Sequence, residues 1–223
     1  MHRMGRILSR AAAIPGAILL LTVVAFPSRA DDRSPGAHKD AHTTAQVFVR
    51  TLAQDAVASL TGRDVTHGQR EAAFRRLLVQ HFDVPQIGKW ALGRYWRVAS
   101  PAEQAEYLEL FEQFIVSTYA HRFRDYTNEQ LEVVEVRRAM DDDGGLVVHS
   151  HIVRDQPKPI RVEWRLATPD GGYKIVDVVV EGVSMVQTQR SEFSSVILRN
   201  GGKVAGLITE LKLKTQQLRA QAQ

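Results

Sequence analysis

Apolar residues recur at helical spacing through much of the first half of the chain. Between residues 44 and 60, five apolar side chains lie near a 3.6-residue repeat: Val47, Phe48, Leu52, Val57 and Leu60. Further helices are predicted over residues 68–82, 83–93 and 101–125. The last of these has the clearest start, because Ser-Pro-Ala-Glu at residues 100–103 combines an N-cap, a first-turn proline and a capping box.

The apolar pattern changes to a period of two in the second half, where Val and Ile become frequent. Four strands are predicted, over residues 130–138, 145–154, 159–167 and 173–181. Their links are short and rich in Asp, Gly and Pro, so neighbouring strands must run antiparallel. The third strand alternates most clearly, with one face formed by Ile160, Val162, Trp164 and Leu166 and the other by Arg161, Glu163 and Arg165. We therefore expect one dry, apolar sheet face and one wet, polar face.

Two further helices are predicted after the strands, over residues 184–198 and 203–214. The whole pattern predicts an α+β fold, in which a four-stranded antiparallel meander sheet is packed on one face by several helices. We expect a single domain over residues 44–217. A disordered polar lead-in at residues 31–43 precedes this domain, and a flexible tail at residues 218–223 follows it.

The first thirty residues have the layout of a secretory signal peptide. Three arginines precede an uncharged apolar run over residues 11–26, and small residues at Ser28 and Ala30 suit signal peptidase. The run is shorter than the about 20 apolar residues that a membrane-spanning helix needs. We therefore expect residues 1–30 to be removed by cleavage before Asp31, and the mature protein to be exported.

The charge balance argues against a nucleic-acid partner. The chain carries 29 basic and 25 acidic residues, and its sequence pI is about 9.5. Four of the arginines lie in residues 1–30, which hold no acidic residue, so the predicted mature chain has 25 residues of each sign. The apparent basicity therefore belongs mostly to the predicted signal segment, and binding to a polyanion loses its main support.

Few residues suggest catalysis or metal binding. No cysteine is present, and we find no nucleophile elbow, glycine-rich phosphate loop or zinc-protease motif. His149 and His151 project from one strand face at a spacing that could hold a metal, but a solvated pair is the favoured interpretation. The acidic run from Asp141 to Asp143 is better explained by a hairpin turn than by a calcium loop. We expect no enzyme activity, no cofactor and no bound metal.

The helix predicted over residues 101–125 has a wide apolar surface made of two adjoining stripes. One stripe contains Leu108, Phe111, Ile115, Thr118 and Tyr119, and the other contains Tyr107, Leu110 and Phe114. Two interpretations remain open. The helix is either sandwiched between the sheet and other helices, or it lines an apolar cavity together with the aromatic residues Trp90, Tyr95, Trp96 and Trp164.

Two stretches resemble the MlaC, or toluene-tolerance, family of periplasmic phospholipid-binding proteins. They are Val-Asp-Val-Val-Val-Glu-Gly-Val-Ser-Met-Val-Gln-Thr-Gln-Arg-Ser-Glu-Phe at residues 176–193 and Phe-Asp-Val-Pro-Gln-Ile-Gly-Lys-Trp-Ala-Leu-Gly at residues 82–93. The resemblance extends over residues 45–213. Within the family, Arg-Asn-Gly-Gly-Lys-Val-Ala-Gly-Leu-Ile at residues 199–208 looks closest to the hopanoid-associated branch called HpnM.

The resemblance implies a soluble periplasmic carrier that holds lipid acyl chains in an apolar cavity between the sheet and its helices. The ligand would be a phospholipid or a hopanoid. The implied partners are an inner-membrane lipid transporter complex and, in the phospholipid branch, an outer-membrane lipoprotein. Residues expected to line the cavity are Trp90, Tyr95, Phe111, Phe114, Ile115, Tyr119, Val148, Ile152, Val162, Trp164, Val178 and Met185.

Two rival hypotheses remain. The domain could be a periplasmic interaction module with a solid core, or an enzyme, since α+β folds of this kind support many chemistries. The role of Arg190 is also open, because its guanidinium could pair with Glu181 or Asp177 or could bind a lipid phosphate. We favour the ion pair, because an arginine close to acidic residues more often forms one.

Overall fold

The computed structural model describes residues 35–62, 64–125, 129–139, 145–154, 158–169 and 171–221. The predicted signal segment and the acidic turn from Asp141 to Asp143 lie outside these residues. In the part of the chain that is described, no helix is long and apolar enough to cross a membrane.

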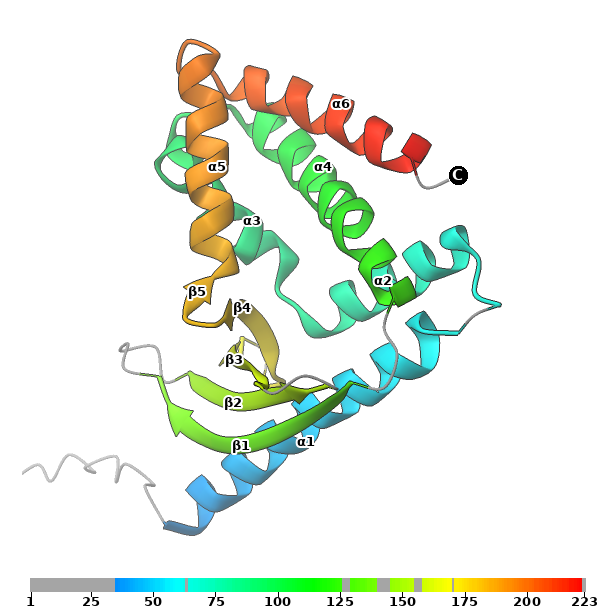
Figure 1. Cartoon of the computed structure of the whole chain (residues 1–223). Helices are drawn as coiled ribbons and strands as arrows, with labels where there is room; N and C mark the ends of the chain where they lie inside the picture. The colour runs from blue at the N-terminus through cyan, green and yellow to red at the C-terminus, as the bar shows by residue number, and fades with distance from the viewer. Residues whose placement is uncertain are drawn as a thin grey trace, which may run out of the picture. The chain divides into compact units, whose positions relative to one another are not determined.

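Helices occupy both ends of the described chain, and the strands lie between them (Figure 1). The helices before the strands are α1 (Pro35–Leu60), α2 (His67–His81), α3 (Val84–Leu92), η1 (Gly93–Arg97), α4 (Pro101–Tyr119) and η2 (Ala120–Asp125). The strands are β1 (Gln130–Arg138), β2 (Leu146–Val153), β3 (Ile160–Ala167), β4 (Lys174–Val180) and β5 (Val183–Ser184). The last helices are α5 (Met185–Arg199) and α6 (Val204–Gln221). The α+β class and the antiparallel sheet are confirmed.

Local signals in the sequence account for several helix starts. Ser100 accepts a hydrogen bond from the backbone N–H of Glu103, and the Glu103 carboxylate accepts one from the backbone N–H of Ser100. This is the predicted capping box, and the bonds from Ser100 lower the pKa of Glu103. Asp83 caps α3 by accepting a hydrogen bond from the N–H of Gln86.

The first and last helices extend beyond the helical ranges predicted from the sequence. Helix α1 begins at Pro35, within the predicted lead-in, and α6 continues to Gln221. Tertiary contacts explain both differences. The hydroxyl of Tyr173 donates a hydrogen bond to the carbonyl of Ala41 at 2.8 Å, and Thr215 in α6 is buried. A polar local sequence does not reveal contacts of this kind.

The sheet has five strands in the order β1-β2-β3-β4-β5, rather than the four that were predicted. The additional strand β5 contains only Val183 and Ser184, which is too short to show an alternating pattern. It pairs with β4 through a two-residue turn in which Glu181 and Gly182 both have positive φ angles, of 50° and 82°. Such a turn matches the twist of the strands that it joins.

The dry face of the sheet is covered by α1, not by the long helix. Seven buried residues form what we call the sheet cluster: Ala45, Val49, Leu52, Leu146, Val148, Leu166 and Ile175. Helix α1 lies against β1 and β2, whereas α4 lies against α6, α3 and α2 (Figure 1). We expected α4 to cover the sheet because its apolar surface is the widest. That surface is instead used for contacts with other helices.

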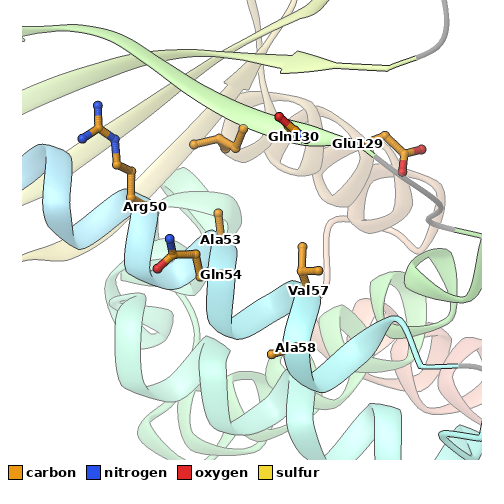
Figure 2. Close-up of a pocket in the computed structure, with 8 residues that line it drawn as sticks. Arg50, Ala53, Gln54, Val57, Ala58, Glu129 and Gln130 are labelled. Carbon is orange, nitrogen blue, oxygen red and sulfur yellow. The ribbon is translucent and has the colours of Figure 1, made fainter.

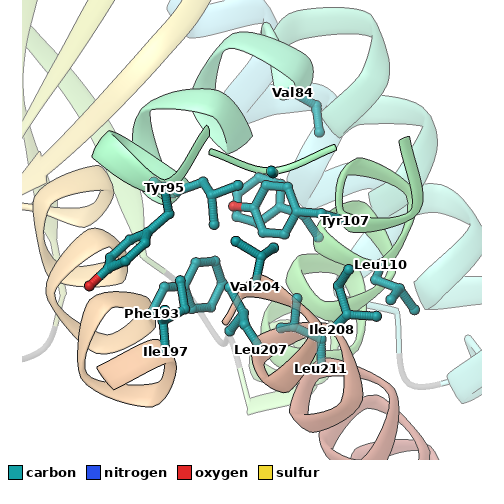
Figure 3. Packing of buried hydrophobic residues seen from close by; sticks show 14 of the residues in the cluster. Val84, Tyr95, Tyr107, Leu110, Phe193, Ile197, Val204, Leu207, Ile208 and Leu211 are labelled. Atoms are coloured by element: carbon teal, nitrogen blue, oxygen red, sulfur yellow. The ribbon is translucent and has the colours of Figure 1, made fainter. Parts of the chain in front are cut away.

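A second apolar core joins α3, α4, α5 and α6, and we call it the helical cluster (Figure 3). The rings of Tyr107, Phe111 and Phe193 lie within about 6 Å of one another, with centroid distances of 5.8, 6.0 and 6.1 Å. The buried hydroxyl of Tyr107 donates a hydrogen bond to the carbonyl of Gly88 at 2.8 Å. Burial raises the pKa of Tyr107 well above its usual value, so this hydroxyl stays protonated and can donate.

The end of α2 connects the two clusters. Phe82 packs against both of them, and the N–H of Asp83 donates to the carbonyl of Ile175 in β4 at 3.0 Å. The ammonium of Lys174 donates to two carbonyls in the last turn of α2, those of Val79 and Gln80. This segment therefore holds the helical part of the domain at one edge of the dry sheet face.

The contact between α3 and α4 depends on a glycine. A Cβ atom at Gly88 would lie 2.8 Å from Leu108 and 3.1 Å from Phe111. We predict that Gly88→Ala lowers the free energy of unfolding by about 1 to 3 kcal/mol, because a filled core resists added volume. The control is Gly68→Ala in α2, where a Cβ would meet nothing within 4 Å. Urea unfolding should show unchanged or slightly raised stability for the control, and equal losses would contradict the prediction.

Candidate functional site

A groove of about 430 Å³ lies between α1 and the start of β1 (Figure 2). We call it the α1–β1 groove, and it is lined by Arg50, Ala53, Gln54, Val57, Ala58, Glu129, Gln130 and Leu131. Figure 2 shows Ala53 and Val57 pointing from α1 toward the strand, with Arg50 and Glu129 at opposite ends. The volume falls in the range of about 300 to 1,000 Å³ that is usual for small-molecule sites.

The α1–β1 groove has an apolar floor and charged ends. Val57 is 39% exposed although it faces the strand, and Leu131 also packs against the sheet cluster. The apolar floor reaches the core, and the cation Arg50 lies at one end of the groove. This combination suits a ligand with an apolar chain and a polar head. None of the residues expected to bind lipid lines this groove, because neither α1 nor Leu131 carries a sequence signal for a site.

A larger pocket of about 730 Å³ lies on the wet face of the sheet, and we call it the polar pocket. The strand residues in its lining include Arg137, Arg138, His149, Glu163, Arg165 and Asp177. Helices α3 and α5 complete it with Trp90, Val186, Gln187 and Arg190. Strand alternation places His149, Glu163 and Arg165 on the face opposite to Val148, Val162 and Trp164, so these polar side chains belong to the wet face. Leu146 and Leu166 of the sheet cluster also belong to the lining.

The buried carboxylate of Asp177 fixes the start of α5 on the sheet. It accepts hydrogen bonds from the hydroxyl of Ser184 at 2.6 Å and from the N–H of Val186 at 3.1 Å. One oxygen also lies 3.8 Å from the guanidinium of Arg165. The carboxylate therefore satisfies an unpaired N–H in the first turn of the helix, where negative charge is favourable.

The favoured ion pair of Arg190 is wrong. Glu181 pairs instead with Arg161, accepting from its N–H at 2.6 Å and from its guanidinium at 3.1 Å, and these bonds lower the pKa of Glu181. Among the described residues, no ion pair joins Arg190 to either Glu181 or Asp177. Its guanidinium lies over Gly93, where a Cβ atom would come within 2.6 Å of Nε.

The residues expected to bind lipid are divided between the two clusters. Tyr95 and Phe111 are buried in the helical cluster, and Phe114 and Ile115 are partly buried against it. In the sheet, Val148 belongs to the sheet cluster, Trp164 and Val178 pack against it, Val162 is buried and Ile152 is partly buried. At the margins, Tyr119 ends α4 under the guanidinium of Arg122, and Met185 begins α5. Their role in lipid binding stays a prediction.

Trp90 is the exception among these residues. Its side chain is 41% exposed, and it lines the polar pocket on the wet face rather than an apolar cavity.

Trp164, by contrast, has its indole N–H satisfied within the sheet, because it donates to the hydroxyl of Ser150 at 2.9 Å. The hydroxyl of Ser150 in turn donates to the carbonyl of Val162 at 3.2 Å. These bonds keep the polar atoms of the dry face paired.

The two histidines lie on the wet face, as expected. His149 lies 3.8 Å from the carboxylate of Glu163. Within the described ranges, no three residues of the metal-ligating types His, Cys, Asp and Glu are grouped so that they could hold a metal ion.

Comparison with known proteins identifies the family. The model of the family described as MlaC protein matches residues 50–213. The chain belongs to the MlaC family. Among curated MlaC relatives, it is 22% identical over 146 residues to the intermembrane phospholipid transport system binding protein MlaC of Haemophilus influenzae, covering 64% of this chain and 67% of that protein.

A second MlaC relative is the toluene tolerance protein ttg2D of Pseudomonas putida, at 24% identity. That match covers 58% of this chain and 60% of the relative, so the chain spans less than two thirds of its length. Among solved structures, the phospholipid-binding protein of Ralstonia solanacearum in complex with a phospholipid matches with a TM-score of 0.69 and 26% identity. This structural match covers 78% of this chain and 98% of the Ralstonia solanacearum chain.

Asp177 is hydrogen-bonded at the start of α5, whereas no ion pair of Arg190 is found among the described residues, and this contrast leads to a stability prediction. Asp177→Ala should lower the free energy of unfolding by about 1 to 3 kcal/mol, because it leaves the N–H of Val186 buried and unpaired. Arg190→Ala removes no ion pair and should change stability by less than about 0.5 kcal/mol. Chemical denaturation of both variants measures the difference, and a larger loss for Arg190→Ala would restore a structural role for this arginine.

Proposed function

We propose that this protein carries a phospholipid between membranes of the cell envelope and holds its acyl chains inside the domain. The likeness to the Ralstonia solanacearum protein carries this proposal. It extends over 98% of a chain that was solved with a phospholipid. The names of the other two relatives, which describe intermembrane phospholipid transport and toluene tolerance, support the same function.

The division of the apolar residues into two clusters supports a place for the acyl chains. In our proposal, the chains lie between the helical cluster and the sheet cluster, next to their common contact at Phe82. Large apolar side chains at the borders of the clusters are only partly buried, among them Phe114, Ile115, Trp164 and Val178. Each methylene buried against such side chains contributes about 0.8 kcal/mol, so two acyl chains need little polar recognition.

The α1–β1 groove is the proposed entrance for the lipid. Leu131 belongs to its lining and also packs against the sheet cluster, so the groove is continuous with apolar side chains of the core. Arg50 lies at one end of the groove, where its guanidinium can meet a phosphate head group. This proposal adds residues of α1 and β1 to the lipid-binding residues expected from the sequence.

The proposed compartment is the periplasm, because the first thirty residues have the pattern of a signal peptide. The proposed partners are an inner-membrane lipid transporter complex and an outer-membrane lipoprotein, as the family resemblance implies. A hopanoid is the alternative cargo that the sequence at residues 199–208 suggests. The rival function is an interaction module that docks on the same complexes and carries no lipid.

Lipid extracted from the purified protein and identified by mass spectrometry tests the cargo. We predict about one phospholipid for each protein molecule, and a severalfold lower amount for Ile115→Trp, with little change in melting temperature. The added ring would occupy the space proposed for the acyl chains. The matched control is Leu207→Trp, in the filled part of the helical cluster, where the side chain is 1% exposed. There the larger ring should cost about 1 to 3 kcal/mol of stability.

Each result of this experiment has a distinct meaning. Hopanoid in the extract would replace the proposed cargo class. Lipid-free protein, or unchanged lipid in Ile115→Trp together with a sharp fall in melting temperature, would favour the interaction module with a solid core.

The entrance is tested separately by its effect on the rate of loading. Ala53→Trp should fill the α1–β1 groove and slow the uptake of a fluorescent phospholipid from vesicles at least severalfold. The control is Thr51→Trp, which adds the same ring to an exposed position of α1 outside the groove. Equal uptake rates for the two variants would show that lipid enters elsewhere.

A further inference from the structure

The charged side chains of the polar pocket are not used in the proposed acyl-chain site. They lie on the opposite side of the sheet from Val148 and Trp164, although Leu146 and Leu166 of the sheet cluster also belong to the pocket lining. We propose that the polar pocket is a second binding site, which takes a phosphate group through Arg165 and Arg190.

The charge of the pocket favours an anion. Four arginines belong to its lining, namely Arg137, Arg138, Arg165 and Arg190, against two acidic residues, Glu163 and Asp177. Arg137 also forms an ion pair with Glu135 at 2.7 Å, and Arg138 is engaged as well, so the proposed site uses Arg165 and Arg190. The formal charge of the lining is positive. A concave surface of one sign concentrates ligands of the opposite sign.

One of the two acidic residues in the lining, Asp177, is already engaged. Both oxygens of Asp177 accept hydrogen bonds at the start of α5, so its pairing with Arg165 at 3.8 Å is a loose one. The side chain of Arg165 is 49% exposed, which leaves its donors accessible from the pocket. The carboxylate of Glu163 lies 3.8 Å from His149. The lining therefore keeps guanidinium donors that its own carboxylates do not satisfy.

Arg190 is placed to complete the site from the helix side. Arg190 follows Val186 by four residues and Gln187 by three, so it lies on the same face of α5 as both, and all three line the pocket. No hydrogen bond or ion pair of Arg190 is found within the described residues. Its guanidinium is held over Gly93, which leaves room for it only because a glycine is present there. Arg165 from β3 and Arg190 from α5 thus line the same pocket from different elements, and in the proposed site both bind the oxygens of one phosphate.

The size of the pocket indicates a phosphate ester rather than a bare ion. Its volume of about 730 Å³ leaves space beyond the phosphate itself, and the half-exposed ring of Trp90 lies at its edge. Such an ester has two possible sources: the head group of a phospholipid at a membrane surface, or a soluble phosphate ester. Both present the same phosphate chemistry to Arg165 and Arg190.

The experiment has a soluble arm and a membrane arm. Isothermal titration of the purified protein with glycerol 3-phosphate and with inorganic phosphate tests the soluble source. Sedimentation with phosphatidylglycerol vesicles, compared with phosphatidylcholine vesicles, tests the head group. Arg190→Gln should weaken saturable binding about tenfold or more, Arg190→Lys should retain part of it, and Arg165→Gln should act like Arg190→Gln. The matched control is Arg199→Gln, at the exposed far end of α5.

The outcomes separate this site from the proposed acyl-chain site. Binding of glycerol 3-phosphate with this pattern of variants supports the proposal with a soluble ester, and binding to vesicles alone with the same pattern supports it with a head group. In both cases the lipid extracted from Arg190→Gln should equal that of the wild type, because the acyl-chain site is elsewhere. No saturable binding in either arm, or equal weakening by Arg199→Gln, would overturn the proposal.

Discussion

The contact between the end of α2 and β4 is the constraint on which the other parts of this domain depend. Phe82 packs against both apolar clusters, and the backbone of Asp83 is hydrogen-bonded to Ile175. One cluster is made by α1 and the sheet, the other by α3 to α6. Because only a short segment joins the two clusters, they form two cores rather than one. The apolar side chains at the border of each cluster therefore do not have to pack against those of the other. A protein that accommodates acyl chains needs apolar surface of this kind, which a fully packed core does not leave open.

The opposite face of the sheet is organised by charge. Asp177 caps α5 and holds its first turn against β4, and Arg190 of this helix lines one pocket together with Arg165 and Trp90. The same strands therefore have two different uses, since alternate residues face the apolar layer and the polar pocket. In the account proposed here, the apolar face holds the chains of a lipid and the polar face binds a phosphate group.

Much of the fold could be predicted from the sequence, because its signals are local. The capping box at Ser100 and Glu103 marks the start of α4, and β1 covers the predicted residues 130–138. Features that depend on tertiary contact were not predicted. The start of α1 is stabilised by Tyr173, which is 132 positions from its partner Ala41, and the two residues of β5 are too few for a pattern.

The candidate site was harder to predict than the fold. Apolar periodicity identifies a wide surface on α4, but it does not tell which partner covers that surface, and the dry face proved to be covered by α1. The ion pair expected for Arg190 was wrong, because Arg161 lies closer to Glu181 through strand pairing. The lining of the α1–β1 groove comes from small and polar residues such as Ala53 and Gln54, which carry no recognisable motif.

The central claim is that lipid acyl chains lie between the two apolar clusters. It is tested most directly with a phospholipid that carries a photoactivatable diazirine in one acyl chain, loaded into the protein and cross-linked by light. Peptide mass spectrometry should then find the label on Phe114, Ile115, Trp164 or Val178. Label confined to exposed apolar residues such as Leu198 would contradict the account.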